Sequence, residues 1–197
     1  ANEQLNRRIE EVERLHQELK EQAIRDPLTG LYNRRYLNEI LAREIARVER
    51  EKDRLSIVVA DIDHFKRIND TYGHQVGDLF LVEIARLSKS QVRNSDIICR
   101  YGGEEFILVL PGLSVEAAVK RSEDIRQLIE NSVVEYQGKI LKATISLGIA
   151  TYPDHGIDAE DLTIKADQAM YQSKQRGRNQ VTIWREEFDR GRQRIPN

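Results

Sequence analysis

Arg100-Tyr101-Gly102-Gly103-Glu104-Glu105-Phe106 lies between two apolar segments, residues 97–99 and 107–110. Apolar segments of this length that flank a pair of glycines are typical of a β-hairpin, so we expect the glycines at its tip. The two adjacent carboxylates, Glu104 and Glu105, are the oxygen ligands that hard divalent cations prefer. Taken alone, this stretch favours an ordinary polar hairpin turn.

The chain has 197 residues, of which 40% are hydrophobic and 32% charged, which predicts one sizeable domain with an appendage. Its formal net charge of −2 lacks the basic signature of nonspecific nucleic-acid binding, so we expect no nucleic-acid partner. The single cysteine, Cys99, excludes an internal disulfide and a cysteine-rich metal site. No apolar run approaches the roughly 20 residues of a membrane span. We therefore expect a cytoplasmic domain, which leaves open a membrane-bound sensor as its parent.

Residues 1–25 are polar and strongly charged and contain neither glycine nor proline. Their apolar or small residues recur at alternating spacings of four and three, which is a heptad pattern. These residues are Leu5, Ile9, Val12, His16, Leu19 and Ala23. The pattern predicts a coiled-coil homodimer, and the alternative is one amphipathic helix packed on its own domain. Because the chain starts inside this pattern, we expect an upstream sensory domain in the full-length protein.

Asp26-Pro27-Leu28-Thr29-Gly30-Leu31 breaks this helix, which places a domain at residues 26–184 and a charged tail or linker at 185–197. The pattern within the domain predicts helices over residues 33–51, 79–87, 114–131 and 158–174. It predicts strands over residues 55–60, 96–99, 107–110, 133–137, 139–151 and 181–184. Helices that alternate with hairpins indicate an α+β fold, with a mainly antiparallel sheet flanked by helices and preceded by a long N-terminal helix.

Acidic residues end the buried strand at residues 55–60, where Asp61 and Asp63 have few structural reasons to lie. If this strand neighbours the hairpin, Asp61 converges with Glu104 and Glu105 on a site suited to Mg²⁺. Lys66, Arg100, Lys174 and Arg178 could neutralise phosphate oxygens. Carboxylates and cations without a P-loop indicate two-metal nucleotidyl transfer of the polymerase-palm kind. The alternative is ordinary surface charge, because Asp, Glu and Lys are common on protein surfaces.

Residues 69–78 form a polar, glycine-containing segment that we expect to be a loop. Its Asn69 and Asp78 offer the paired donors and acceptors that a purine edge needs. The alternative is a plain connector in which Asp78 caps the following helix.

Several motifs in order resemble the GGDEF family of diguanylate cyclases, in its GGEEF form at residues 102–106. The resemblance covers residues 26–184. It is carried by Asp26-Pro27-Leu28-Thr29-Gly30-Leu31, Asn33-Arg34-Arg35, Asp61-Ile62-Asp63-His64-Phe65-Lys66, Asn69-Asp70, Gly73-His74, Gly77-Asp78, Ser146-Leu147-Gly148-Ile149-Ala150, Ala166-Asp167-Gln168-Ala169-Met170-Tyr171 and Gly177-Arg178-Asn179.

This resemblance implies a palm-like domain, related to nucleotidyl cyclases, that condenses two GTP into cyclic di-GMP and two pyrophosphates. Each domain would bind one GTP, so two copies must face each other. Asp61, the Ile62 carbonyl and Glu104 would hold Mg²⁺ or Mn²⁺, and Glu105 would take or position the 3′-hydroxyl proton. The implied substrate contacts are Lys66, Lys174 and Arg178 to phosphate, Asn69 and Asp78 to guanine, and Leu28, Phe65 and His74 around the nucleotide. Asp63 would support the site rather than bind the metal.

Arg93-Asn94-Ser95-Asp96 has the spacing of the family's inhibitory product site, which implies that cyclic di-GMP is both product and inhibitor. An R-x-x-D sequence also arises by chance, and Asp96 could simply start the strand. Two residues depart from the family pattern. Asp124 stands where many relatives have an arginine, which bears on the strength of inhibition, and His64 stands where phenylalanine is frequent. A domain that binds nucleotide without catalysis, or a pure dimerisation module, remains the alternative.

Overall fold

The computed structural model describes residues 2–189, with side chains from residue 4 onward. The helices are α1 (Asn2–Ile24), α2 (Arg34–Glu51), α3 (Phe65–Tyr72), α4 (His74–Ser90), α5 (Val115–Asn131) and α6 (Ala159–Gln175). The strands are β1 (Tyr32–Asn33), β2 (Leu55–Ile62), β3 (Ile97–Arg100), β4 (Glu105–Pro111), β5 (Val134–Tyr136), β6 (Lys139–Leu141), β7 (Ile145–Tyr152) and β8 (Val181–Ile183).

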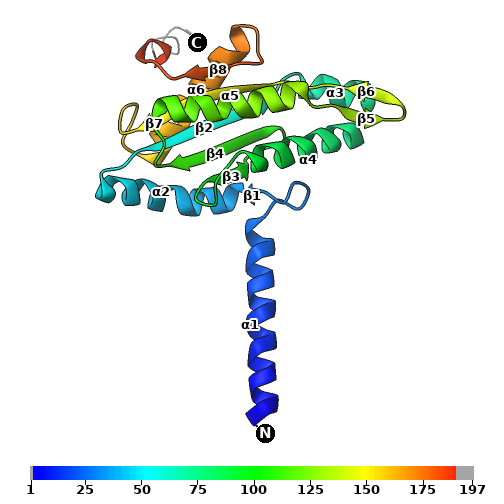
Figure 1. Ribbon diagram of the computed structural model, residues 1–197, viewed down its shortest axis with the longest axis vertical. Coiled ribbons are helices and arrows are strands. Elements are labelled where there is room, and N and C mark those ends of the chain that lie inside the picture. Colours follow the sequence, from blue (N-terminus) through cyan, green and yellow to red (C-terminus); the bar gives the residue numbers. More distant parts are fainter. Residues whose placement is uncertain (1, 190–197) are drawn as a thin grey trace, which may run out of the picture.

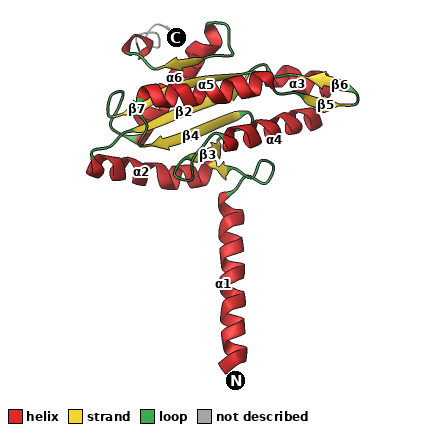
Figure 2. Cartoon of the chain, in the orientation of Figure 1, coloured by secondary structure: helices red, strands yellow, loops and turns green. Residues whose placement is uncertain are grey.

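One six-stranded sheet, in the order β1-β3-β4-β2-β7-β8, forms the centre of the domain (Figures 1 and 2). Strand β2 lies between β4 and β7 and is antiparallel to both, whereas β1 pairs with β3, and β8 with β7, in parallel. All eight residues of β2 are buried, as expected for a strand covered on both faces. The prediction of a mainly antiparallel sheet with helices on it is confirmed.

The two faces of β2 pack against different helices because successive side chains alternate across a strand. Val58, Ala60 and Ile62 join the cluster that includes α4 and α5. Ile57 and Val59 join the cluster that includes α2 and α6. Odd-numbered positions of β2 thus face α2 and α6, and this parity also fixes where Asp61 points.

Helix α1 stands away from the domain as a single continuous rod (Figure 1). Its heptad residues remain exposed, with Leu5 at 56% and both Val12 and Leu19 at 64%. The predicted helix is confirmed, and the alternative of a helix packed on its own domain is wrong. No helix in the described part of the chain has both the length and the apolar character needed to cross a bilayer.

Residues 69–78 are helical rather than a loop, so that prediction is wrong. Helix α3 carries Asn69, and Gly73 alone, with φ of +87°, separates it from α4. The polar residues lie on the outer face of α3, while Phe65 and Ile68 are buried in the core and stabilise so short a helix. Asp78 lies inside α4 and therefore does not cap it.

Two other predictions differ from the structure. Residues 139–151 form two strands instead of one, because β6 pairs with β5 in a small separate sheet while β7 enters the main sheet. The tail contributes to the core, contrary to expectation, since Phe188 is only 8% exposed and packs in the α2/α6 cluster beside Trp184. The remainder of the tail, residues 190–197, lies outside the described residues.

Candidate active site

The predicted hairpin forms next to β2, and this brings the acidic residues together. Asp61 lies directly opposite Glu105 in the β2–β4 register. Just beyond this pair, the Ile62 backbone N–H donates to the Glu104 carbonyl oxygen over 3.3 Å. Because Asp61 and Glu105 are directly opposite each other in adjacent strands, their side chains share one face of the sheet, which is the face that α6 covers.

The glycine at position 102 makes room for a carboxylate. A Cβ atom there would lie 2.6 Å from Glu105 Oε2, so a larger residue would displace that side chain. Arg100 braces the same tip, since its Nη2 donates to the Gly103 carbonyl over 2.9 Å and its Nη1 lies 3.2 Å from Asp26 Oδ1. Arg100 thus holds the hairpin against the Asp26 turn, and these contacts engage the guanidinium that the sequence offered as a possible phosphate ligand.

Burial raises the pKa values of all three carboxyls at this site. For Asp61, desolvation is the largest cause, the Lys174 ammonium opposes it, and the charges of Asp63 and Asp167 add to it. For Glu104 and Glu105, desolvation again comes first and the Asp61 charge second. Three carboxyls that resist ionisation together form a site where a cation would be strongly favoured.

Asp61 is the most deeply buried of the three carboxyls. Lys174 Nζ lies 2.7 Å from Asp61 Oδ1 in an ion pair, and this ammonium opposes the rise in pKa that burial causes. A buried carboxylate is costly to ionise, and a metal ion would add further positive charge beside it.

The expected metal ligands are too few to complete the coordination of Mg²⁺ by themselves, so the substrate would have to supply some of the rest. Among residues 2–189, no three His, Cys, Asp or Glu side chains gather in an arrangement that would by itself hold a metal ion. The expected set has two carboxylates, from Asp61 and Glu104, and one backbone carbonyl, from Ile62. Mg²⁺ normally keeps several waters and takes further ligands from substrate phosphates, so this sparse set is chemically reasonable.

A cavity of about 520 Å³ opens beside the carboxylates. Asp61, Glu105, Asp167 and Lys174 line it, and Phe188 forms part of its wall. The sequence singled out neither Asp167 nor Phe188. Asp167 lies seven residues before Lys174 on α6, a spacing that places both on one helix face and could have revealed it.

The residues expected to read guanine come together where α3 meets α4. A Cβ atom at Gly77 would lie 2.0 Å from Asn69 Oδ1 and 3.0 Å from the Phe65 ring, so these three residues are in close contact. Asp78, the next residue, is exposed, and Asn69 Oδ1 is buried without a hydrogen-bond partner among the described residues. The amide of Asn69 carries both a donor and an acceptor, as pairing with the edge of a guanine requires.

The other expected substrate contacts lie on several elements of the domain. Leu28 is half-buried against the core cluster that contains Phe65. His74 begins α4 and is exposed. Lys66 lies in the first turn of α3, and Lys66 and Arg178 are both exposed.

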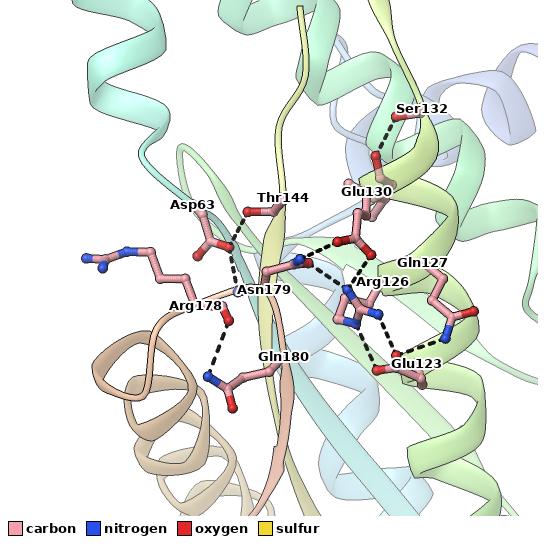
Figure 3. Close-up of polar contacts among 11 residues, drawn as sticks. Asp63, Glu123, Arg126, Gln127, Glu130, Ser132, Thr144, Arg178, Asn179 and Gln180 are labelled. Carbon is pink, nitrogen blue, oxygen red and sulfur yellow. Dashed lines mark hydrogen bonds and ion pairs between the residues drawn. The ribbon is translucent and has the colours of Figure 1, made fainter.

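Asp63 has a different environment from Asp61. It accepts hydrogen bonds from Thr144 Oγ1 at 2.7 Å and from the Asn179 backbone N–H at 3.0 Å (Figure 3). A third comes from Ser146 Oγ, also at 2.7 Å. Its carboxylate is therefore supplied with donors from two neighbouring segments. This geometry agrees with a supporting role and leaves Asp63 little capacity for a metal.

The R-x-x-D segment forms a turn between α4 and β3. Asp96 Oδ2 accepts from the Arg93 backbone N–H over 2.8 Å and forms an ion pair with Arg121 of α5. The Asp96 side chain is fully buried, while Arg93 is exposed. A cavity of about 230 Å³ lies here, and Arg25, Arg93 and Asp96 are among its lining residues. Sequence reasoning missed Arg121 because no motif links a residue on α5 to this turn.

A family model described as diguanylate cyclase, GGDEF domain, matches residues 23–180. A Treponema denticola protein named diguanylate cyclase A is 41% identical over 169 residues, which are 84% of this chain and 46% of that protein. Diguanylate cyclase DgcP of Pseudomonas aeruginosa is 40% identical over 185 residues, or 92% of this chain and 27% of that protein. The chain thus spans less than half the length of these curated relatives.

Solved structures of GGDEF domains are also similar to this chain. The coiled coil and GGDEF domain of DgcB from Caulobacter crescentus, in complex with c-di-GMP, has a TM-score of 0.83 and 31% identity, covering 92% of this chain and 98% of that chain. The active GGEEF domain of a diguanylate cyclase from Vibrio cholerae has a TM-score of 0.73 and 36% identity, covering 78% of this chain and 97% of that chain. The predicted palm-like fold is confirmed.

Proposed function

The chain belongs to the GGDEF family of diguanylate cyclases, and on this premise we propose that it condenses two GTP into cyclic di-GMP with release of two pyrophosphates. The observation that carries the proposal is the pairing of Asp61 with Glu105 beside Glu104, at a site where all three pKa values are raised. Such a cluster favours a divalent cation together with a phosphorylated substrate.

In the proposed reaction, the 3′-hydroxyl oxygen of one GTP attacks the α-phosphorus of the other, and the bond to pyrophosphate breaks. Glu105 accepts the hydroxyl proton, and its raised pKa makes it a stronger base than an ordinary glutamate. Asp61, the Ile62 carbonyl and Glu104 hold Mg²⁺, or Mn²⁺, which supplies charge stabilisation for the phosphoryl oxygens when bound. The same step with the two substrates exchanged closes the ring.

The remaining residues bind and orient GTP. Lys66, Lys174 and Arg178 neutralise phosphate oxygens, and Lys174 can exchange its contact with Asp61 for one with phosphate once a metal occupies that carboxylate. Asn69 and Asp78 read the guanine edge, supported by the unpartnered Asn69 Oδ1. Leu28, Phe65 and His74 surround the nucleotide in this proposal.

We further propose that the protein acts as a homodimer, since each domain would supply one GTP and half of the site. The exposed apolar seam of α1 supports a coiled coil that brings the two domains face to face. An upstream sensory domain would act through this helix, and the cytoplasm would supply the GTP. Deleting residues 2–24 should lower the specific activity at low protein concentration, and equal activity at every concentration would contradict the dimer proposal.

Product inhibition at Arg93 and Asp96 is the third part of the proposal. The buried Asp96 carboxylate is held by Arg121, so Arg93 is the more accessible of the two residues. Asp124, exposed on α5, offers no cation at the position where relatives have an arginine. Arg93→Ala should preserve the initial rate and relieve inhibition by added cyclic di-GMP, whereas unchanged inhibition would contradict the assignment.

One assay tests the proposed function. The protein is incubated with GTP and Mg²⁺ at micromolar concentration, and the nucleotides are separated by chromatography. We expect cyclic di-GMP and pyrophosphate in a ratio of one to two, and no turnover by Glu104→Ala. If the wild type formed no cyclic dinucleotide, the proposed cyclase activity would be contradicted. A domain that only binds nucleotide would then be favoured.

A further inference from the structure

The segment that follows α6 has an unusual backbone. Gly177, Arg178 and Asn179 have φ values of +112°, +66° and +47°, and only glycine adopts this region without steric cost. The Arg178 N–H donates to the Ser173 carbonyl over 2.9 Å, and its own carbonyl accepts from Gln180 Nε2 over 3.2 Å. These contacts fasten the backbone of the segment to α6 and to the start of β8.

A clamp from α5 holds the side chain of Asn179. Asn179 Nδ2 donates to Glu130 Oε1 over 2.7 Å, and Asn179 Oδ1 accepts from Arg126 Nη1 over 2.8 Å (Figure 3). Arg126 is itself fixed, with its guanidinium bound to Glu130 at 2.8 Å and to Glu123 at 2.6 Å. Only 11% of the Arg126 side chain is exposed, whereas Glu123 and Glu130 are exposed at 37% and 42%, so the clamp is a fully paired network around a buried guanidinium.

The clamp and the candidate site lie on opposite sides of Asn179. Its backbone N–H donates to Asp63, whose segment leads from Asp61 to Lys66. Figure 3 shows the Arg178 side chain pointing away from Arg126 and Glu130. The network therefore holds the segment from behind and leaves the Arg178 guanidinium directed outward. It also ties the segment that carries Arg178 to the segment that carries Lys66.

We propose that Asn179 is a positioning residue, clamped by Arg126 and Glu130, that fixes the left-handed 177–179 segment so that Arg178 meets the triphosphate of GTP. The inference rests on the proposed function for the role of Arg178. It adds that α5, which carries no residue expected to touch GTP, determines how well the phosphates are held. The packing of α5 on the sheet does not depend on this clamp, because Ile125 and Ile129 are buried in the core cluster.

Asn179→Gly provides the main test, because glycine keeps the positive φ without strain and removes only the clamped side chain. The ligand is 3′-deoxy-GTP with Mg²⁺, which lacks the attacking hydroxyl, and 3′-deoxyguanosine is the probe without phosphates. We expect Asn179→Gly to weaken 3′-deoxy-GTP binding about tenfold, the order of one charge-assisted contact. Binding of 3′-deoxyguanosine should not change.

Two further variants keep the test sharp. Arg126→Gln should cause a similar selective loss, and Gln127→Ala is the matched control. Gln127 donates to Glu123 from the same helix over 3.0 Å, yet it does not contact Asn179, so its variant should bind both ligands as the wild type does. Thermal unfolding of each variant establishes that the fold is retained.

A double-mutant cycle shows whether the clamp acts through Arg178. Arg178→Ala alone should reproduce the loss, and Arg178→Ala combined with Asn179→Gly should lose no more. Additive losses, equal weakening of both ligands, or wild-type binding by Asn179→Gly would overturn the clamp while leaving the proposed function intact. A wild type that fails to bind 3′-deoxy-GTP would overturn both.

Discussion

Asp61 and Asp63 leave the same end of strand β2, two residues apart, and their carboxylates have contrasting surroundings. Asp63 accepts three hydrogen bonds, from Thr144, Ser146 and Asn179. Asp61 Oδ1 is paired with the Lys174 ammonium, and burial together with the charges of Asp63 and Asp167 raises the Asp61 pKa. Asp63 is thus supplied with hydrogen-bond donors, whereas Asp61, Glu104 and Glu105 concentrate negative charge that, in our proposal, a bound cation would neutralise. The contrast separates the residues that build this site from those that would perform its chemistry.

The largest expected effect comes from removing the negative charge of Asp61. Asp61→Asn keeps the shape of the side chain but withdraws a metal ligand, so we expect turnover of GTP to fall by about 10³-fold. Initial rates of cyclic di-GMP formation measure this effect. Asp124→Asn, an exposed change on α5, is the control and should leave the initial rate unchanged. A rate within tenfold of the wild type for Asp61→Asn would contradict the metal assignment.

Removing the charge of Asp63 should instead lower the stability of the folded protein. Asp63→Asn replaces one accepting oxygen by an amide that faces donors, so we expect the free energy of unfolding to fall by about 2 kcal/mol. Denaturant unfolding measures the change. Asp63→Asn should lose less turnover per folded molecule than Asp61→Asn. If Asp63→Asn were as stable as the wild type, its hydrogen bonds would not be the brace described above.

The smallest effect is a dependence of stability on pH. Because the folded-state pKa of Glu104 lies above its ordinary value of 4.5, the folded protein holds this proton more tightly than the unfolded chain does. Its contribution is therefore most favourable below pH 4.5 and is lost as the pH rises through the folded-state pKa. Glu104→Gln should remove that loss and raise the unfolding free energy above this window by less than about 1 kcal/mol, since solvent screens a half-exposed group.

Thermal unfolding of the wild type and Glu104→Gln between pH 4 and pH 8, without Mg²⁺, checks this prediction. The difference between the two proteins is the relevant quantity, because other carboxyls with lowered pKa values, such as Glu83 and Glu123, change stability in the opposite direction. A difference that does not grow with pH would contradict the raised pKa of Glu104.

The sequence predicted the surroundings of Asp61, Glu104 and Glu105 better than those of Asp63. The hairpin follows from strand periodicity, which is visible in local patterns. The convergence of Asp61 with Glu105 was predicted on the condition that the strand carrying Asp61 lies beside the hairpin, and the β2–β4 register meets that condition. Asn69 was identified as a candidate, but the helix that carries it was not, because burial of Phe65 and Ile68 overrides the polar composition of residues 69–78.

The contacts of Asp63 and Asp96 could not be predicted because they join distant segments. Asn179 donates to Asp63 across 116 residues of sequence, and Arg121 reaches Asp96 across 25. No local period or spacing encodes such pairs, since they depend on how helices dock on the finished sheet. Phe188 escaped notice for the same reason, in a tail whose charge gave no sign of a core position.

Calorimetric binding of 3′-deoxy-GTP with and without Mg²⁺, to Asp61→Asn and Asp63→Asn side by side, tests the central contrast most directly. The account predicts that Asp61→Asn loses the Mg²⁺-dependent gain in affinity, while folded Asp63→Asn retains most of it. An equal Mg²⁺ dependence in the two variants would contradict the division of this site into a supporting carboxylate and a cation-binding one.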